Sequence, residues 1–275
     1  MRLFRTILFG LLALSLVACE SFPTGGAAGS PASPRLQDIL ASGELRVGLS
    51  GNQPPLNMRN KQGEIIGLEV DLMNALAESM RLKARFVTKP FAELLPALEK
   101  GEVDLVISGM TITPERNARV AFAGPYFISG KSVLSKSETI ARVDSATELD
   151  DPNRTYAALA GSTSEQFVNE VLPQAKLVTT PDYDSAVQMV IDDEVEALVA
   201  DFPFCALSVL RYPEAGLSAL MTPFTIEPLG IALPADDPLL VNLVVNYLNT
   251  LEGTGLLTRF KAKWLYEDAW LSELP

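Results

Sequence analysis

Short hydrophobic runs recur along the chain, separated by polar stretches that contain turn residues. The runs that predict strands are residues 44–50, 84–89, 103–109, 155–160, 176–180, 196–201 and 229–234. Several of these runs are almost continuously apolar, which is typical of strands that are covered on both faces. Between them lie stretches with helical periodicity, such as residues 67–82, whose apolar side chains fall on one face. Strands that alternate with helices predict an α/β fold with mainly parallel sheets.

The alternation of strands and helices is interrupted near the middle of the chain. It runs from residue 44 to about 110 and restarts near 154, and residues 128–150 form a mixed connector. After residue 222, one more strand pattern is followed by two helical stretches, 237–251 and 253–264. Two α/β lobes joined by two crossings explain this order, but a single sheet of seven strands explains it about equally well.

The first 18 residues predict a secretory signal peptide. Arg2 and Arg5 precede an apolar run, residues 7–18, which is shorter than the roughly 20 residues that a membrane crossing takes. A buried core helix is the alternative, and both the basic flank and the terminal position argue against it. The run ends in LVAC, which resembles a bacterial lipobox, so Cys19 is the residue that we expect to carry lipid.

Residues 19–35 predict a flexible tether. They are rich in Gly, Ser, Pro and Ala and offer almost nothing to bury. A lipidated Cys19 would hold the chain at a membrane without crossing it. We therefore expect an exported protein of the cell envelope that is lipid-anchored, on the periplasmic side if the cell is Gram-negative.

Composition and charge argue against several classes of function. The chain has no histidine and only two cysteines, so we expect no histidine-based catalysis, no metal site and no cofactor. Cys205 is then most simply a small buried hydrophobic residue. The formal net charge of −12 becomes about −14 without Arg2 and Arg5, which argues against nucleic acid as a partner. We expect a monomer.

Polar segments follow three of the predicted strands, where ligands bind in open parallel sheets. These segments are GMTITPER (109–116), GSTSE (161–165) and Asp201. Taken singly, each is an ordinary helix start or helix cap. Taken together, an arginine, a helix N-terminus and an aspartate would place an anion site beside a cation site. Such a pair of sites suits an α-amino acid zwitterion.

Four blocks of the sequence carry a family resemblance: GEIIGLEVDLMNALAESM, FAELLPALEKGEVDLVISGMTITPERNARVAFAGPYF, AGSTSEQF and EALVAD. They resemble the family 3 bacterial extracellular solute-binding proteins, over about residues 44–266. The resemblance implies a two-lobed periplasmic-binding-protein fold of type II with two hinge crossings. Lobe 1 would comprise residues 36–129 and 225–275, and lobe 2 residues 130–224.

The resemblance also implies a function and a set of ligand contacts. The protein would capture an amino acid, or a similar small carboxylate, and deliver it to an ABC transporter permease. Arg116 would bind the ligand's α-carboxylate and Asp201 its α-ammonium group. The remaining expected contacts from the matching motifs are Gly109 and Thr111 in lobe 1, and Ser162 and Thr163 in lobe 2.

One loop departs from the family pattern. Residues 50–58 read SGNQPPLNM, where the family usually has an aromatic residue before its proline. Gln53 stands at that position and Leu56 at a second aromatic position, whereas Phe91 matches the aromatic residue that packs on the ligand. A ligand with a changed, polar or uncharged side chain is one interpretation, and drift in a loosely binding protein is the other.

Two further functions stay open. Some members of this fold family are lyases that act on acids related to prephenate or arogenate, and Glu165 stands where such a cyclohexadienyl-dehydratase-like enzyme could keep a general acid. Because histidine is absent and Asp201 suits an ammonium group, we expect binding rather than catalysis. The other alternative is a sensory ligand-binding module without a permease, which only the tether and the changed Gln53 loop favour.

Overall fold

The computed structural model describes residues 33–274, which belong to one compact unit with two five-stranded sheets. The predicted signal peptide, Cys19 and nearly all of the predicted tether lie outside the described residues. Within residues 33–274, every helix falls short of the length and apolar character that a membrane crossing requires.

The first sheet has the strand order β5-β1-β6-β13-β7. Strand β1 pairs in parallel with β5 and β6, whereas β13 pairs antiparallel with both β6 and β7. The strands of this sheet are Glu44–Leu49 (β1), Lys83–Thr88 (β5), Leu105–Val106 (β6), Ala121–Ser129 (β7) and Glu227–Leu233 (β13). The sheet is therefore mixed, and its parallel part comes from the βαβ pattern of the early sequence.

The second sheet has the strand order β10-β9-β11-β8-β12. Strands β9, β10 and β11 are parallel, and β8 pairs antiparallel with β11 and β12. Its strands are Lys131–Ser135 (β8), Thr155–Leu159 (β9), Lys176–Thr180 (β10), Ala197–Asp201 (β11) and Ser218–Ala219 (β12). The expectation of mainly parallel sheets is thus corrected in both lobes by antiparallel strands, which come from the segments that connect the sheets.

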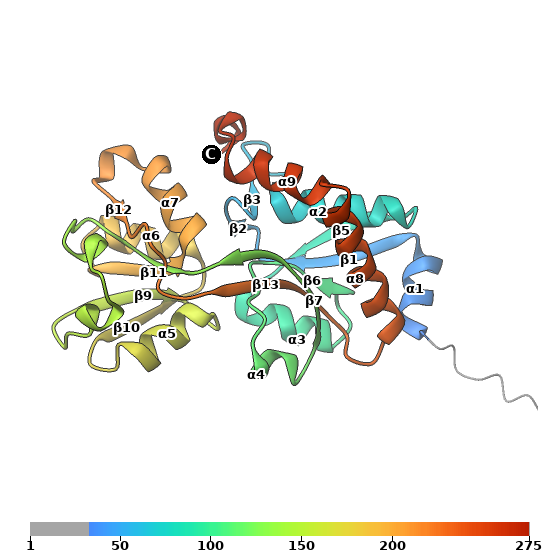
Figure 1. Cartoon of the computed structure of the whole chain (residues 1–275), viewed down its shortest axis with the longest axis horizontal. Coiled ribbons are helices and arrows are strands. Elements are labelled where there is room, and N and C mark those ends of the chain that lie inside the picture. The colour runs from blue at the N-terminus through green and yellow to red at the C-terminus, as the bar shows by residue number, and fades with distance from the viewer. Residues whose placement is uncertain (1–32, 275) are drawn as a thin grey trace, which may run out of the picture. The chain divides into compact units, whose positions relative to one another are not determined.

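Helices cover both sheets (Figure 1). With the first sheet lie α1 (Pro34–Ser42), α2 (Leu68–Ser79), α3 (Leu94–Glu99), α4 (Pro114–Asn117), α8 (Pro238–Gly253) and α9 (Leu256–Leu265). With the second lie α5 (Thr163–Val171), α6 (Tyr183–Ile191) and α7 (Phe202–Arg211). The apolar face read from the sequence of α2 is buried, with Leu72, Met73 and Leu76 at most 1% exposed.

The chain passes between the sheets twice (Figure 1). Strand β7 ends at Ser129 and β8 begins at Lys131, while β12 ends at Ala219 and β13 begins at Glu227. The single seven-stranded sheet is therefore excluded, and the two-lobed fold with two crossings is confirmed. We call the elements from α1 to β7 and from β13 onward lobe 1, and those from β8 to β12 lobe 2. The exact lobe bounds given above stay a prediction.

Two parts of the sequence interpretation need correction. The mixed connector, residues 128–150, contains the end of β7 and all of β8, and the sequence pattern singled out neither strand. In β8, a lysine and serines interrupt the apolar residues. The predicted tether also extends too far, since α1 begins at Pro34. The hydroxyl of Ser33 donates to the carboxylate of Asp237, and the Leu36 N–H donates to the same carboxylate at 3.1 Å. These bonds tie residues 33–36 to the start of α8.

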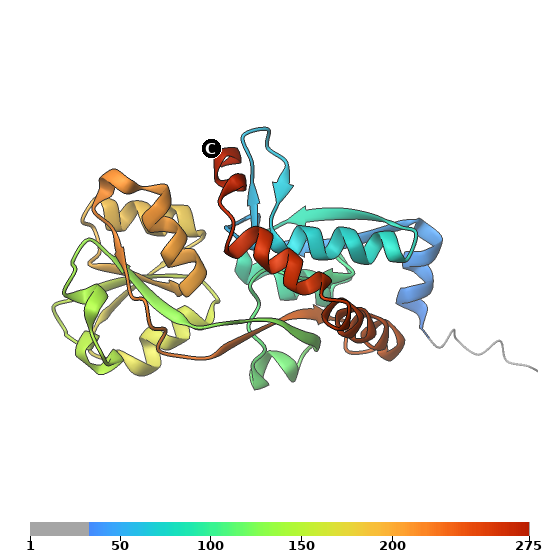
Figure 2. The same cartoon turned by 45° about the horizontal axis from the view of Figure 1, so that its top comes forward.

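A small third sheet carries the loop that departs from the family pattern. It consists of β2 (Asn52–Gln53), β3 (Asn57–Arg59) and β4 (Ile65–Ile66), in that order. Its hairpin stands beside the C-terminal segment (Figure 2). Lys61 joins them, because its N–H donates to the Glu273 carbonyl and its Nζ to the Ser272 carbonyl, both at 2.9 Å.

A buried carboxyl group fixes this loop against the first sheet. Glu69 on α2 is 0% exposed and accepts hydrogen bonds from the Gly109 N–H at 2.6 Å, from Asn57 Nδ2 at 2.6 Å and from the Tyr126 hydroxyl. Asn57 in turn accepts from the Gly51 N–H at 2.6 Å. Burial raises the pKa of Glu69, and its three hydrogen bonds oppose that rise. One side chain thereby positions both the 50–53 loop and Gly109.

Replacing Glu69 with alanine is expected to lower the free energy of unfolding by about 3 kcal/mol, because three buried donors lose their acceptor. Chemical denaturation at about pH 4.5, below the raised folded-state pKa of Glu69, measures this loss. The matched control is Glu78→Ala on the exposed side of the same helix, which should change stability by no more than about 0.5 kcal/mol. Equal effects of the two substitutions would contradict a structural role for the Glu69 network.

The difference in stability between wild type and Glu69→Ala should depend on pH. Because burial raises the pKa of Glu69 above its ordinary value of 4.5, the folded chain holds this proton more tightly than the unfolded chain. The stabilisation from Glu69 is then complete below about pH 4.5 and declines as the pH rises through the folded-state pKa. The stability difference between wild type and Glu69→Ala should shrink over that range, and a constant difference would exclude the raised pKa.

Candidate ligand-binding site

Arg116 lies where the two lobes meet. It follows β6 in the first turn of α4, whose N-cap is Thr113, and the Thr113 hydroxyl accepts the Arg116 N–H at 3.2 Å. Its Nη1 donates to the Thr111 carbonyl at 2.9 Å, and its Nη2 donates to the Gly161 carbonyl of lobe 2 at 3.0 Å. The residue is only 8% exposed. Within residues 33–274 its hydrogen bonds go to neutral carbonyls, and no carboxylate forms an ion pair with it.

An aromatic ring covers the guanidinium group. The Cζ atom of Arg116 lies 5.6 Å from the centre of the Phe91 ring, which comes from η1 (Phe91–Glu93) and is 5% exposed. Burial lowers the pKa of Arg116, and the charges of Glu227 and Asp201 oppose that effect. Because an arginine stays protonated in proteins, the result is a buried cation on an aromatic face.

Gly109 and Gln53 lie against each other in lobe 1. Gly109 has a φ of +57°, and a Cβ atom there would lie 2.4 Å from Gln53 Nε2. Gln53 is 2% exposed, and its Oε1 accepts from the Ser108 hydroxyl at 3.4 Å. The amide that replaces the family's aromatic residue therefore packs directly over a glycine. Since Glu69 already accepts the Gly109 N–H, the carbonyl of Gly109 is the backbone group left for a ligand.

The predicted lobe 2 residues form the start of α5. The Ser162 hydroxyl accepts the N–H groups of Ser164 and Glu165, both at 3.2 Å, and donates to the Leu159 carbonyl at 2.6 Å. Ser162 is therefore the N-cap of α5, as the local sequence indicates. The Thr163 hydroxyl lies 3.2 Å from the Thr111 hydroxyl of lobe 1, so the two threonines meet across the lobes.

Asp201 does not stand alone at the end of β11. Lys131 lies directly opposite it in the antiparallel pairing of β8 with β11, and Lys131 Nζ is 2.6 Å from Asp201 Oδ1. The same Nζ is 3.6 Å from Glu227 Oε2 on β13. The side chain of Lys131 is 2% exposed, that of Asp201 7% and that of Glu227 10%. Burial raises the pKa of Asp201, and Lys131 opposes that rise.

The structure brings most of the predicted site residues into one contact network. Arg116 contacts Thr111 and Phe91, and Thr111 contacts Thr163. Asp201 joins this network only indirectly, because Glu227 accepts from the Thr163 hydroxyl at 3.1 Å and lies near Lys131.

Sequence reasoning missed Lys131, Glu227 and Glu69 altogether. The available signal was a charged residue inside or at the end of an otherwise apolar run, as in ISGKSVL and IEPLGIAL. Residues in such runs are buried, and a buried charge has a partner or a function. The sequence does not show which partner the fold supplies.

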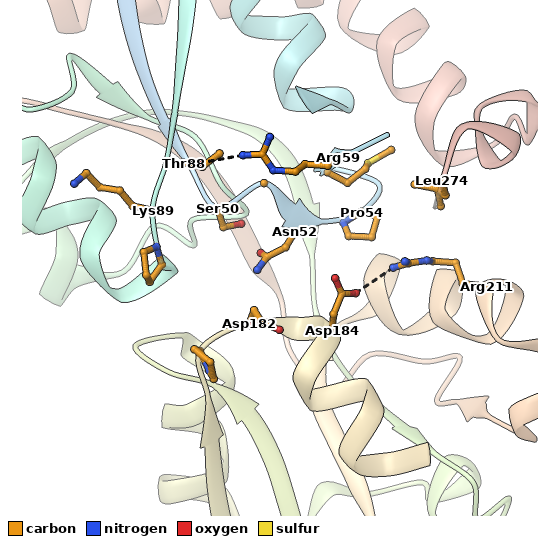
Figure 3. Close-up of a pocket in the computed structure, with 14 residues that line it drawn as sticks. Ser50, Asn52, Pro54, Arg59, Thr88, Lys89, Asp182, Asp184, Arg211 and Leu274 are labelled. Carbon is orange, nitrogen blue, oxygen red and sulfur yellow. Dashed lines mark hydrogen bonds and ion pairs between the residues drawn. The ribbon is translucent and has the colours of Figure 1, made fainter. Parts of the chain in front are cut away.

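Two pockets are lined by residues of both lobes. One, of about 320 Å³, is lined on its site side by Phe91, Arg116, Gly161, Ser162 and Glu165. The other, of about 450 Å³, has charged side chains in its lining, among them Lys89, Asp184 and Arg211 (Figure 3). There the 50–54 loop and the end of β5 face the start of α6, and Asp184 pairs with Arg211 at 3.4 Å. Of the contact network described above, Arg116 and Phe91 belong to these linings, whereas Thr111, Thr163, Lys131, Asp201 and Glu227 do not.

Comparison with known proteins places the chain among bacterial solute-binding proteins and one enzyme. Cyclohexadienyl dehydratase of Pseudomonas aeruginosa is 28% identical over 262 residues, which is 95% of each chain. The ABC transporter arginine-binding protein 1 of Escherichia coli is 26% identical over 230 residues, 82% of this chain and 91% of that protein.

The solved structures agree in fold. An ancestral amino acid-binding protein, described as a precursor of cyclohexadienyl dehydratase, is 36% identical and superimposes with a TM-score of 0.77. The match covers 84% of this chain and 99% of the ancestral one. The family model of the Bacterial extracellular solute-binding proteins, family 3, matches residues 45–267. With its two mixed sheets, its two crossings and this match over most of its length, the chain belongs to that family.

Proposed function

We propose that this protein is a lipid-anchored extracytoplasmic solute-binding protein that captures an amino acid or a similar small carboxylate and delivers it to an ABC permease. The observation that carries the proposal is Arg116, a buried cation at the junction of the lobes whose side-chain hydrogen bonds within residues 33–274 go to two neutral carbonyls. An arginine fork matches a carboxylate in geometry and in charge, and it gains more from that partner than from two carbonyls.

The ligand would bind between the lobes and be enclosed by a hinge motion at the two crossings. Its carboxylate would take the guanidinium donors that now reach Thr111 and Gly161. The hydroxyls of Thr111 and Thr163, which face each other at 3.2 Å, would separate to contact the ligand from opposite sides. Phe91 would contribute its ring, and the start of α5 would add N–H donors for the anion.

Close contact between the lobes supports a closed arrangement around this site. Gly161 has a φ of +73°, and a Cβ atom there would lie 3.0 Å from the Cβ atom of Ala92 in lobe 1. Only glycine fits both that conformation and that separation. Entry of a ligand therefore requires the lobes to move apart first.

Anchoring and delivery to a permease rest on the sequence and on the relatives. The predicted signal peptide ends within the lipobox-like LVAC, whose last residue is Cys19, and two relatives are named as binding proteins of ABC transporters. A tether of about a dozen residues would let the domain turn toward a membrane partner.

A dehydratase is the second candidate, and one contact favours it. Glu165 Oε2 accepts the Gly161 N–H at 2.6 Å and lies in the same pocket as Arg116. A carboxyl group beside a carboxylate-binding arginine is in the place where a general acid would act on a bound acid. The relatives include both a dehydratase and binding proteins, so the activity has to be measured.

Arg116→Ala is expected to lower the affinity for a carboxylate ligand by at least about 100-fold, because two charged hydrogen bonds to the ligand are lost. A thermal-shift screen of the twenty amino acids and of small mono-, di- and tricarboxylates identifies the ligand. A ligand at a concentration of 100 times its Kd stabilises the folded protein by about 2.7 kcal/mol, which the screen detects. Calorimetry then compares the variants, with Arg85→Ala on the exposed face of β5 as the control. An unchanged affinity of Arg116→Ala would remove the assigned site.

For the dehydratase candidate, incubation of the wild type with prephenate or arogenate should yield the aromatic product, and Glu165→Gln should abolish it. Glu170→Gln, at an exposed position of the same helix, should leave the rate unchanged. No product from the wild type, with a ligand bound in calorimetry, would leave the binding protein as the function.

Anchoring has its own test. Cys19→Ser should move the exported protein from the membrane fraction to the soluble extracytoplasmic fraction, because a thiol is required for lipid attachment. Cys205→Ser should leave it in the membrane fraction, since Cys205 is 0% exposed inside lobe 2. Membrane association of Cys19→Ser would contradict the lipid anchor.

A further inference from the structure

The Lys131 ammonium group lies beside Asp201, the residue expected to bind a ligand ammonium group. Lys131 Nζ lies 2.6 Å from Asp201 Oδ1, and the lysine side chain is 2% exposed. The strand register holds this pair, because Lys131 and Asp201 are direct neighbours across β8 and β11. The Lys131 backbone is also fixed, since its N–H donates to the Thr225 hydroxyl at 2.9 Å. The ion pair therefore follows from the fold and not from a mobile surface side chain.

The second carboxylate of this cluster also has its donors. Glu227 Oε1 accepts from the Thr225 hydroxyl at 2.9 Å, and its Oε2 accepts from the Thr163 hydroxyl at 3.1 Å. A ligand ammonium group brings three N–H donors and needs acceptors that are still available. It would also stand within a few ångströms of the buried Lys131 ammonium, and like charges at that separation repel strongly in a buried site.

The surroundings of Arg116 differ from those of Asp201 and Glu227 in the partners that are already present. Arg116 has only the carbonyls of Thr111 and Gly161 as hydrogen-bond partners, and no carboxylate forms an ion pair with it within residues 33–274. A carboxylate on the ligand therefore finds a cation that has no ion-pair contact within residues 33–274, although Glu227 and Asp201 act on it from a distance, whereas an ammonium group on the ligand finds a carboxylate that is already in an ion pair.

We propose that Lys131 is a specificity-determining residue, and that the ligand is a carboxylate with an oxo or hydroxyl oxygen, instead of an ammonium group, on its α-carbon. Lys131 has three N–H donors, of which one is directed to Asp201 and a second lies toward Glu227. The third can donate to an oxygen atom on the α-carbon. Asp201 then positions Lys131 and does not contact the ligand. The inference rests on the proposed function and narrows its ligand class to 2-oxo and 2-hydroxy acids.

The primary test needs only the wild-type protein and matched ligand pairs. Calorimetry compares L-alanine with pyruvate, L-leucine with 4-methyl-2-oxopentanoate, L-phenylalanine with phenylpyruvate, and L-glutamate with 2-oxoglutarate. In the pair whose side chain fits, the 2-oxo acid should bind at least about 10-fold more tightly than the amino acid. Tighter or equal binding of the amino acid would overturn the inference and leave the proposed function in place. Failure of every compound, together with an empty thermal-shift screen, would count against the proposed function itself.

Variants then locate the preference in Lys131. Lys131→Met retains the length of the side chain and removes its charge, which frees Asp201 for a ligand ammonium group. The ratio of affinities should then move toward the amino acid by at least about 10-fold. Adding Asp201→Asn to Lys131→Met should cancel that gain, because the carboxylate is no longer charged.

Lys136→Met, just after β8, is the matched control. Its ammonium group is paired with the exposed Asp193, and it should leave the ratio of affinities unchanged. An unchanged ratio in Lys131→Met, with wild-type-like folding by circular dichroism, would overturn the role of Lys131. If Lys131→Met does not fold, the ratio measured with the wild type decides the matter alone.

Discussion

Buried charge at the junction of the two lobes is the constraint on which the rest of the structure depends. Arg116, Lys131, Asp201 and Glu227 are all buried, and a buried charge without partners costs several kcal/mol. Strand register supplies Lys131 with its counter-ion, and the two lobes together supply the carbonyls that Arg116 needs. Some of these contacts also join the lobes, because Arg116 of lobe 1 donates to Gly161 of lobe 2 and Lys131 of lobe 2 lies 3.6 Å from Glu227 of lobe 1.

The crossing strands do more than connect the sheets. Lys131 is the first residue of β8 and Glu227 the first residue of β13, so both charged residues stand where the chain enters a strand next to a crossing. Asp201 ends β11 and Arg116 lies in α4 after β6, beyond the strand ends where ligands of α/β proteins usually bind. Under the proposed function, ligand recognition and lobe closure would be coupled through the same side chains. A change of charge at a crossing can alter which ligand permits closure.

Membership of the family indicates where a site would lie, but it does not decide between ligand binding and catalysis. The relatives include a dehydratase and several binding proteins on one fold. A carboxylate-binding arginine serves either activity, because both act on acids. What distinguishes them lies in neighbouring groups such as Glu165, which contacts Gly161 here, and in whether the aspartate at the end of β11 is available to a ligand.

The sequence by itself determined the α/β class, the strands of the parallel core, the helix starts at Thr113 and Ser162, and the arginine that ends the GMTITPER segment. These features depend on periodicity and helix capping, which are determined by residues close together in the sequence. The strands β7 and β8, the antiparallel pairing of β13, the packing of Gln53 on Gly109 and the pairing of Asp201 with Lys131 came only from the tertiary structure. Asp201 and Lys131 are 70 residues apart, and only the register of two strands makes them neighbours. No local pattern encodes that register.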